Sequence, residues 1–154
     1  MVVPKFRVWD VHNKKMFTES ELVIWNGNVY ANDYQKIFKS FIEEARGLVG
    51  YNVDDKYLMQ STGLFDKNGK EIFEGDVAVY LDGDNNPIYE NAVVKFGQHT
   101  NMNTIYEREP VYIGLYIEGQ RGTATFDVDR MYNDCEGRLT IIGNIYENPE
   151  LVEG

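Results

Sequence analysis

The chain has 154 residues and a mass of 17.8 kDa, which is enough to bury a hydrophobic core without a disulfide or a structural metal. Hydrophobic residues make up 43% of it and aromatic residues 14%, which argues against intrinsic disorder. The chain has a net charge of −10: residues 51–154 hold eight Lys and Arg and 19 Asp and Glu, a net charge of −11, whereas residues 1–50 hold seven and six. This acidic field disfavours binding to nucleic-acid phosphates and favours either solubility alone or attraction of a basic partner.

Several features predict a soluble, cytoplasmic protein. No basic and apolar leader begins the sequence, and no apolar run reaches the roughly 18 residues of a membrane span. The single Cys135 cannot form an intramolecular disulfide.

Residues 1–50 predict a small β-meander followed by one helix. Residues 5–10 alternate as a strand does, and residues 11–15 supply a turn. Residues 22–25 and 29–31 flank Asn26-Gly27, a strong hairpin signal because both turn positions need positive φ.

A helix is predicted over residues 34–46. Its apolar side chains recur at three- and four-residue spacings, and Lys and Glu side chains take the opposite face. Such a stripe favours core packing over a partner groove. The stripe comprises Tyr34, Ile37, Phe38, Phe41, Ile42 and Ala45.

The pattern from residue 51 onward is β. Turn signals at residues 66–70, 82–87 and 119–122 separate short strands, and residues 97–110 read as a polar loop. We therefore predict a mainly β protein, all-β with one helix, in which residues 51–154 form a small, strongly bent SH3-like barrel. With the N-terminal meander and helix, this makes one compact domain. The predicted strands are 57–60, 76–81, 91–96, 111–117, 123–129 and 139–143.

No catalytic constellation is evident. His12 and His99 fall among polar turn and loop residues, which predicts solvent-exposed imidazoles. Cys135 lies in an acidic turn that disfavours a reactive thiolate. Asp127 and Asp129 share a predicted strand face, as do Asp54 and Lys56, but neither pair has a second contributing segment. We predict no enzyme activity.

The segment from Asp82 to Asn86 has the oxygen-rich composition of a calcium loop. It lacks the glycine of that motif at the sixth position and the glutamate at the twelfth, which is Val93. An ordinary β-turn explains its Asp, Gly and Asn residues better. We predict neither a metal nor another cofactor.

Aromatic residues are numerous enough to stack nucleic-acid bases. Interleaved basic residues are sparse, however, because only Arg108, Arg121 and Arg130 lie near them. Core packing is therefore favoured over base stacking, and nucleic-acid binding is disfavoured. The aromatic residues considered are Trp9, Trp25, Tyr30, Tyr106, Tyr112, Tyr116, Tyr132 and Tyr146.

Glycines and small polar residues, which favour turns, recur through residues 58–81. Thr62-Gly63 allows a bend, and Asn68-Gly69 a tight reversal. Gly75 allows a further special backbone conformation, and Asp76 can accept backbone N–H bonds where a strand begins. This stretch therefore reads as strand, turn and strand rather than as a ligand site.

Three stretches in order, "PKFRVWDVHNKKMF", "LMQSTGLFDKNGKEIFEGDVAVY" and "IIGNIYENPELV", resemble the YopX-like family of phage and prophage proteins. The resemblance implies a mostly β protein of the bacterial cytoplasm during infection or lysogeny. It implies no activity, cofactor or catalytic residue. We interpret the signature residues as structural; they are Thr62, Gly63, Leu64, Asp66, Gly69, Glu74, Gly75, Asp76, Gly143, Asn144, Tyr146, Glu147, Asn148 and Pro149.

The leading functional hypothesis is a non-enzymatic accessory protein that acts through protein–protein contacts, including self-association. One alternative is a nucleic-acid-associated SH3-like barrel. Another is an acidic DNA mimic or inhibitor of a basic host protein, which the charge of residues 51–154 favours.

Overall fold

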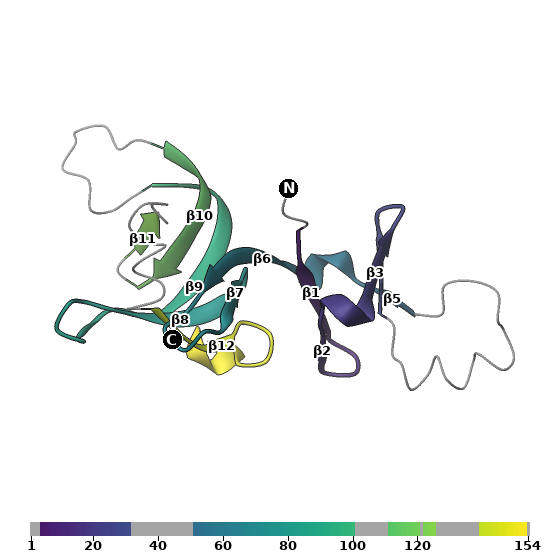
Figure 1. Ribbon diagram of the computed structural model, residues 1–154, viewed down its shortest axis with the longest axis horizontal. Coiled ribbons are helices and arrows are strands. Elements are labelled where there is room, and N and C mark those ends of the chain that lie inside the picture. The colour runs from purple at the N-terminus through teal and green to yellow at the C-terminus, as the bar shows by residue number, and fades with distance from the viewer. Residues whose placement is uncertain (1–3, 32–50, 101–110, 121, 126–138, 154) are drawn as a thin grey trace, which may run out of the picture. The chain divides into compact units, whose positions relative to one another are not determined.

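The computed structural model describes residues 4–31, 51–100, 111–120, 122–125 and 139–153 (Figure 1). The chain divides into two compact units, Met1–Gln60 and Ser61–Gly154. Regular structure in the described residues consists of β-strands and three-residue 3₁₀ helices, so the predicted mainly β fold is confirmed. The helix predicted over residues 34–46 lies outside the described residues.

The first unit holds two small antiparallel arrangements of strands. In one, β1 (Phe6–Asp10) pairs with β2 (Lys15–Phe17) and with the first three residues of β6 (Leu58–Phe65). In the other, strand order is β3-β4-β5. The bounds of these strands are Leu22–Trp25, Asn28–Ala31 and Tyr51–Val53.

The hairpin between β3 and β4 turns at Asn26-Gly27, as predicted. Trp25 pairs with Asn28, and the two residues between them have φ of 51° and 77°. Both values are positive, as a two-residue hairpin turn requires.

A hydrophobic core lies within the first unit. It consists of the buried residues Val8, Phe17, Val29, Ala31 and Val53. Two 3₁₀ helices, η1 (Glu19–Glu21) and η2 (Asp55–Tyr57), connect strands of this unit. Neither was predicted from the sequence, because one turn of helix leaves no periodic pattern.

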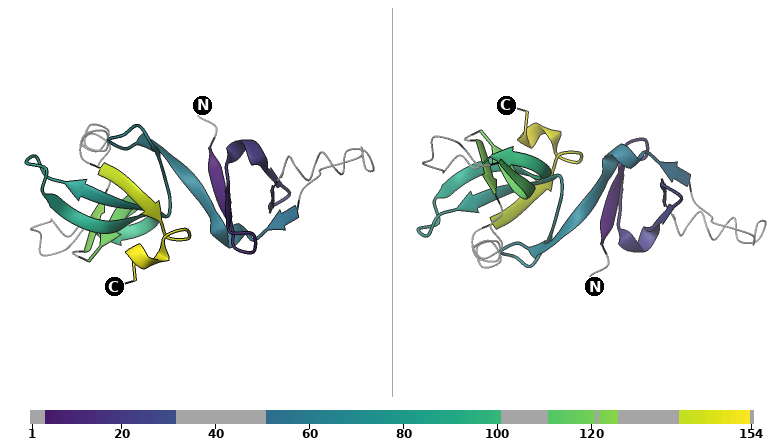
Figure 2. Two further views of the ribbon diagram at one scale, coloured as in Figure 1. Left: turned by 90° about the horizontal axis from the view of Figure 1, so that it is seen from below. Right: turned by 90° about the horizontal axis from the view of Figure 1, so that it is seen from above.

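The second unit is built on a five-stranded antiparallel sheet in the order β11-β10-β9-β8-β12. The sheet curls into a half-barrel (Figures 1 and 2), which confirms the predicted strong bend. The core of this unit includes the buried sheet residues Ala78, Val94, Ile117 and Leu139, together with Ile72 from outside the sheet. The strands are β8 (Asp76–Leu81), β9 (Pro87–Thr100), β10 (Val111–Gly119), β11 (Gly122–Thr125) and β12 (Leu139–Asn144).

Two further short elements belong to the described residues of this unit. Strand β7 (Glu71–Phe73) pairs with the later residues of β6, and the 3₁₀ helix η3 (Pro149–Leu151) follows β12. The sequence did not predict β7. Among the described residues, no helix combines the length and apolar character needed to span a bilayer.

Strand β9 continues through residues that were predicted to be loop. Residues 97–100 pair with β10, and Gly97 stands opposite Gly114. Both glycines have φ of 150°, which side-chain-bearing residues rarely adopt, so this pair permits a local bend within a continuous ladder. The prediction of a polar loop from residue 97 was therefore wrong for its first four residues.

His99 follows this glycine pair and is buried, contrary to the prediction of an exposed imidazole. Its side chain is only 6% exposed, and its ring stacks on Tyr116 with centroids 4.3 Å apart. Its Nδ1 lies 3.0 Å from the Gly97 carbonyl oxygen. The error arose because stacking between two strands leaves no trace in the local polarity of the sequence.

Candidate functional site

The signature residues lie in the second unit, where many of them hold segments of the chain together. Asp66 is 2% exposed, and its carboxylate accepts bonds from the Asn68 and Lys70 amides at 2.9 and 2.8 Å. Its second oxygen accepts from the Ile141 amide at 2.9 Å. Asp66 thereby shapes its own turn and joins it to β12.

The Glu74-Gly75-Asp76 turn is equally engaged in backbone contacts. Gly75 donates to the Val94 carbonyl at 2.8 Å and accepts from the Ile145 amide at 3.0 Å. The Asp76 carboxylate accepts from the Phe73 amide at 2.8 Å, a bond of the kind expected at this strand start. These bonds give the turn a structural role.

The bends at Gly63 and Gly69 also have the backbone expected of them. The φ values are 75° at Gly63, 77° at Gly69 and 86° at Gly75, all in the left-handed region. The Thr62 hydroxyl donates to the Ile72 carbonyl at 2.8 Å, which ties β6 to β7. Leu64 packs against the core of the second unit.

The C-terminal signature forms a compact turn after β12. The Asn144 side-chain oxygen accepts from the Tyr146 and Glu147 amides at 3.0 and 2.9 Å. The backbone N–H of Asn144 in turn donates to the Asn148 side-chain oxygen at 3.3 Å. A methyl group on Gly143 would lie 2.5 Å from that same oxygen, so glycine leaves room for this turn, which Pro149 follows at the start of η3.

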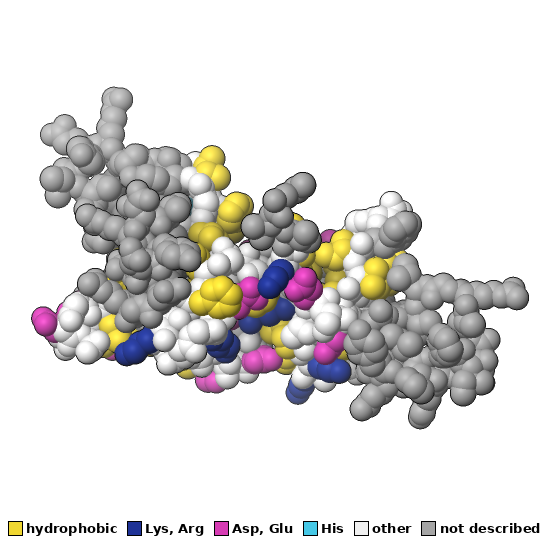
Figure 3. All heavy atoms as spheres, viewed as in Figure 1, with side chains coloured by type: hydrophobic (Ala, Val, Ile, Leu, Met, Phe, Trp, Pro, Cys, Tyr) yellow, Lys and Arg dark blue, Asp and Glu magenta, His cyan; other side chains and the backbone are white. Residues whose placement is uncertain are grey.

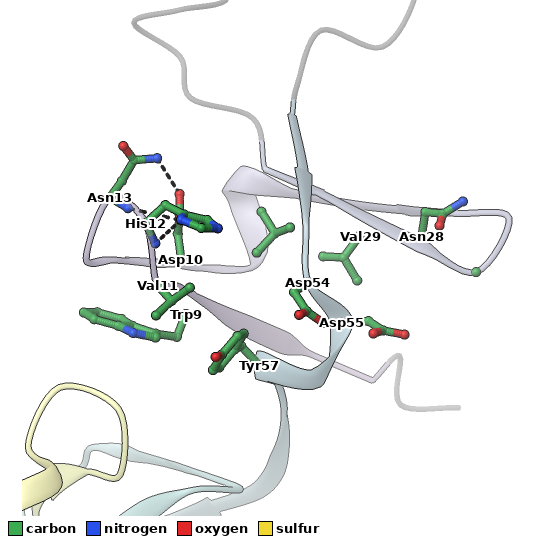
Figure 4. A pocket seen from close by; sticks show the side chains of 12 residues that line it. Trp9, Asp10, Val11, His12, Asn13, Asn28, Val29, Asp54, Asp55 and Tyr57 are labelled. Carbon is green, nitrogen blue, oxygen red and sulfur yellow. Dashed lines mark hydrogen bonds between the residues drawn. The ribbon is translucent and has the colours of Figure 1, made fainter.

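A pocket of about 870 Å³ lies in the first unit (Figure 4). Its described walls come from β1 and the turn that follows it, from the β3–β4 hairpin, and from the end of β5 with η2. We call this the β1–η2 pocket. Trp9, Val11 and Tyr57 give it apolar surface, and Asp54 and Asp55 bring carboxylates to its wall.

Local sequence explains how Trp9 comes to face the pocket. Along β1, Val8 enters the core while Trp9 points to the other side of the strand and stays half-buried. Asp10 is buried and accepts bonds from the His12 amide at 3.0 Å and from the Asn13 side-chain nitrogen at 2.7 Å. The Asp10 carboxylate is therefore committed to the turn that forms one wall.

The opposite wall depends on the cap of η2. Asp54 precedes this helix and accepts from the Lys56 amide at 3.1 Å. Tyr57 at the end of η2 packs against the core of the first unit, which fixes its ring at the pocket. Asp55 is exposed and makes no side-chain hydrogen bond or ion pair with any described residue.

The predicted pairing of Asp54 with Lys56 on one strand face is wrong. Asp54 caps η2 and Lys56 lies inside it, so the two do not alternate along a strand. The Lys56 Nζ instead lies 4.9 Å from the centroid of the Tyr57 ring. His12 is exposed, as predicted, and lines the β1–η2 pocket.

The Asp82–Asn86 segment is a turn, as predicted. The Asp82 carboxylate accepts from the Asp84 and Asn86 amides at 2.8 and 2.9 Å. Within the described part of the chain, no group of three His, Cys, Asp or Glu side chains is placed to hold a metal ion.

Three of the aromatic residues considered for base stacking are at least partly buried. Tyr116 stacks on His99, and Tyr30 and Tyr146 are half-buried. The candidates that lie outside the described residues are Tyr106, Arg108, Arg121, Asp127, Asp129, Arg130, Tyr132 and Cys135.

A second exposed feature lies at the bent end of β9 and β10. Phe96 is 63% exposed and Ile113 is 83% exposed. Pairing sets Phe96 opposite Leu115 and Ile113 opposite Gln98, so all four share the sheet face that carries Val94 and Ile117. Hydrophobic atoms are visible over this part of β10 in Figure 3.

Comparison with known proteins identifies the family. The family model described as "YopX protein" matches residues 5–153. Among solved structures, the crystal structure of protein EF1440 from Enterococcus faecalis is similar at 22% identity and a TM-score of 0.46, covering 99% of this chain and 100% of that one. A search of curated proteins gives no match. Because the family model spans nearly all of its residues, the chain belongs to the YopX family.

Proposed function

We propose that the protein is a non-enzymatic accessory protein that acts by binding a protein partner at the β1–η2 pocket. The family resemblance supports a setting in the cytoplasm of a bacterium that carries the phage or prophage gene. The observation that carries the proposal is the pocket itself, which combines half-buried Trp9 and Tyr57 with exposed carboxylates. Trp and Tyr at such positions are typical anchors of protein interfaces.

The chemistry of the pocket lining favours recognition over catalysis. Ser, Thr, Cys and Lys do not occur among the described residues of its walls, which leaves His12, Tyr57 and the aspartates as the groups that could act in catalysis. The Asp10 carboxylate is already engaged with its own turn. What remains is aromatic surface, the Asp54 and Asp55 carboxylates, and the exposed His12 imidazole.

The same acidic lining weighs against the nucleic-acid alternative, because carboxylates repel phosphates. It is compatible with the second candidate, an acidic inhibitor or DNA mimic directed at a basic host protein. That candidate draws separate support from the excess of acidic residues, 19 against eight basic ones, in residues 51–154. In both cases the partner is a protein with basic surface.

The test compares partner capture by two variants of the full chain. Trp9→Leu keeps an apolar side chain but removes the aromatic face from the pocket, whereas Phe65→Leu makes a similar change at a 44% exposed site in the second unit. Cross-linking and quantitative capture from lysogenic cells identify the partner, and its affinity is then measured with purified proteins. We expect Trp9→Leu to weaken binding at least about tenfold and Phe65→Leu to leave it unchanged.

Equal binding by both variants and the original chain would contradict this role of the pocket. Circular dichroism of each variant establishes that the chain is folded before binding is compared.

A further inference from the structure

We propose that Asn26, at the tip of the β3–β4 hairpin, is a site of spontaneous deamidation through a succinimide formed with Gly27. The inference goes beyond the proposed function and does not depend on it. It is carried by the backbone angles and the exposure of the turn, and by the contrast with the hydrogen bonds of the other Asn-Gly pair in the sequence, Asn68-Gly69.

The reaction needs only atoms of two adjacent residues and water. The Gly27 backbone nitrogen attacks the side-chain carbonyl carbon of Asn26 and forms a C–N bond to it. The attacking nitrogen loses its proton to solvent, and the side-chain nitrogen leaves as ammonia. Water then opens the five-membered succinimide ring at either of its carbonyl groups, which gives aspartate or isoaspartate. Glycine favours ring closure because it has no Cβ to crowd the attacking nitrogen.

The hairpin brings the Asn26 backbone close to the conformation of the ring. Closure of the succinimide fixes ψ of Asn26 at about −120°, the value of the first central residue in a type II′ turn. The φ values of 51° at Asn26 and 77° at Gly27 are those of a type I′ turn. Types I′ and II′ share a positive φ at the first central residue, and both close two-residue hairpins. A flip of the single peptide plane between Asn26 and Gly27 therefore reaches the ring geometry while β3 and β4 stay paired.

Few interactions oppose this flip. The Gly27 N–H donates to no acceptor in the described part of the chain, and the Asn26 carbonyl accepts a long bond of 3.4 Å from Asn28 Nδ2. Asn26 and Gly27 are both exposed, and a Cβ at Gly27 would meet nothing within 4 Å. The nucleophile is thus open to solvent and free to turn.

Asn68-Gly69 is equally exposed, but its peptide plane belongs to the turn that Asp66 holds. The Gly69 N–H donates to the Asp66 carbonyl at 3.0 Å, so a flip of this plane would break that bond. The amides of Asn68 and Lys70 on either side are both bonded to the Asp66 carboxylate, at 2.9 and 2.8 Å. The structure therefore predicts unequal rates for two pairs that are alike in sequence.

Deamidation of Asn26 would alter the β1–η2 pocket, because Gly27 and Asn28 belong to its lining (Figure 4). Aspartate would add a negative charge at this end of the pocket. Isoaspartate would lengthen the main chain of the turn by one CH₂ group, which changes the geometry of a two-residue hairpin.

The test follows both pairs in one sample. The folded full chain is incubated at mildly alkaline pH, and peptide digests are analysed by mass spectrometry for replacement of –NH₂ by –OH at positions 26 and 68. Electron-transfer fragmentation distinguishes aspartate from isoaspartate. We expect deamidation of Asn26 to be at least about tenfold faster than that of Asn68, because the reaction at Asn68 must first break hydrogen bonds. Asn26→Gln should abolish the fast reaction and leave the rate at Asn68 unchanged.

The same chain unfolded in urea is the matched control. Unfolding removes the bonds to Asp66, so the two rates should become similar. Equal rates in the folded chain would overturn the inference. A difference that is as large in urea as in the folded chain would also overturn it, because neighbouring residues in the sequence, and not the two turns, would then set the rates.

Discussion

At the scale of single residues, Asp10, Asp66 and Asp82 perform the same local task in different surroundings. Each carboxylate accepts backbone N–H bonds from residues two to four positions further along its own turn. Asp66 differs because its second oxygen also accepts from Ile141, which lies 75 residues away in sequence. One side chain thus supports both a local turn and a distant strand.

This difference predicts unequal losses of stability. Asp66→Ala leaves the buried Ile141 N–H and two turn amides without their charged acceptor, and should lower the free energy of unfolding by about 3 kcal/mol. Asp82→Ala removes the acceptor of two amides in an exposed turn and should cost about 1 kcal/mol. Urea denaturation of the two variants measures the difference, and equal losses would refute the special role of Asp66.

Residue-level predictions from sequence succeeded where the cause was local. The Asn26-Gly27 turn, the Asp82 turn and the backbone bond to Asp76 depend on neighbouring residues alone. The burial of His99 depends on Tyr116, which reaches it across strands, and was not predicted.

At the scale of elements, strand prediction worked best where β-branched residues cluster. Strand β8 has the bounds predicted for it, and β10 was predicted to within two residues at its end. Strand β7 was not predicted because its three residues lie between two turn signals. The end of β9 was not predicted because Gly97, Gln98 and His99 are weak strand formers. Pairing with a neighbouring strand overrides such weak preferences.

The turn after β12 offers a test at this scale. Gly143→Ala would place a methyl group 2.5 Å from Asn148 Oδ1 and 3.0 Å from Leu151 Cδ1, so the turn must shift. We expect a loss of about 1–3 kcal/mol in the free energy of unfolding. Gly119→Ala is the control, because its methyl group would have its nearest contact at an ordinary 3.4 Å, to Tyr89 Cδ1.

Thermal or urea unfolding distinguishes the two glycine variants. Should Gly119→Ala prove as costly as Gly143→Ala, close approach of Asn148 would not explain the glycine at position 143.

At the scale of the whole molecule, composition and strand pattern sufficed for the mainly β class and the bent sheet. The β1–η2 pocket could not be predicted, because its walls come from three segments between residues 9 and 57 with no shared motif. Asp54 and Asp55 look like ordinary loop residues in the sequence, and only the structure places them on the wall of this pocket.

We also propose that two copies of the whole chain associate with each other. A chain with a net charge of −10 repels its own copies, and this repulsion is weakest for a contact through an uncharged surface. Residues 96–98 and 113–115 are uncharged, and they include the exposed Phe96 and Ile113. This patch is therefore the surface through which we expect two copies to associate.

Sedimentation velocity across a concentration series tests this expectation. Ile113→Ser should weaken dimer formation at least about tenfold, because burial of an isoleucine contributes about 1.5–3 kcal/mol. Ile142→Ser makes the same change at a 41% exposed site outside the patch and should leave association unchanged. A chain that stays monomeric at every concentration would exclude this contact.

Strand β6 has a consequence for any attempt to study the two units separately. Residues Phe6, Arg7 and Val8 pair with its residues 58–60, and its residues 61 and 65 pair with β7, so the boundary at Gln60 and Ser61 falls inside one strand. A fragment that stops before residue 58 would keep the pairing of β1 with β2 but leave the other edge of β1, at Phe6, Arg7 and Val8, without its ladder partners. An N-terminal fragment that ends in the segment before β6 would therefore expose an unpaired strand edge and tend to aggregate. An N-terminal fragment for expression has to retain at least Leu58–Gln60.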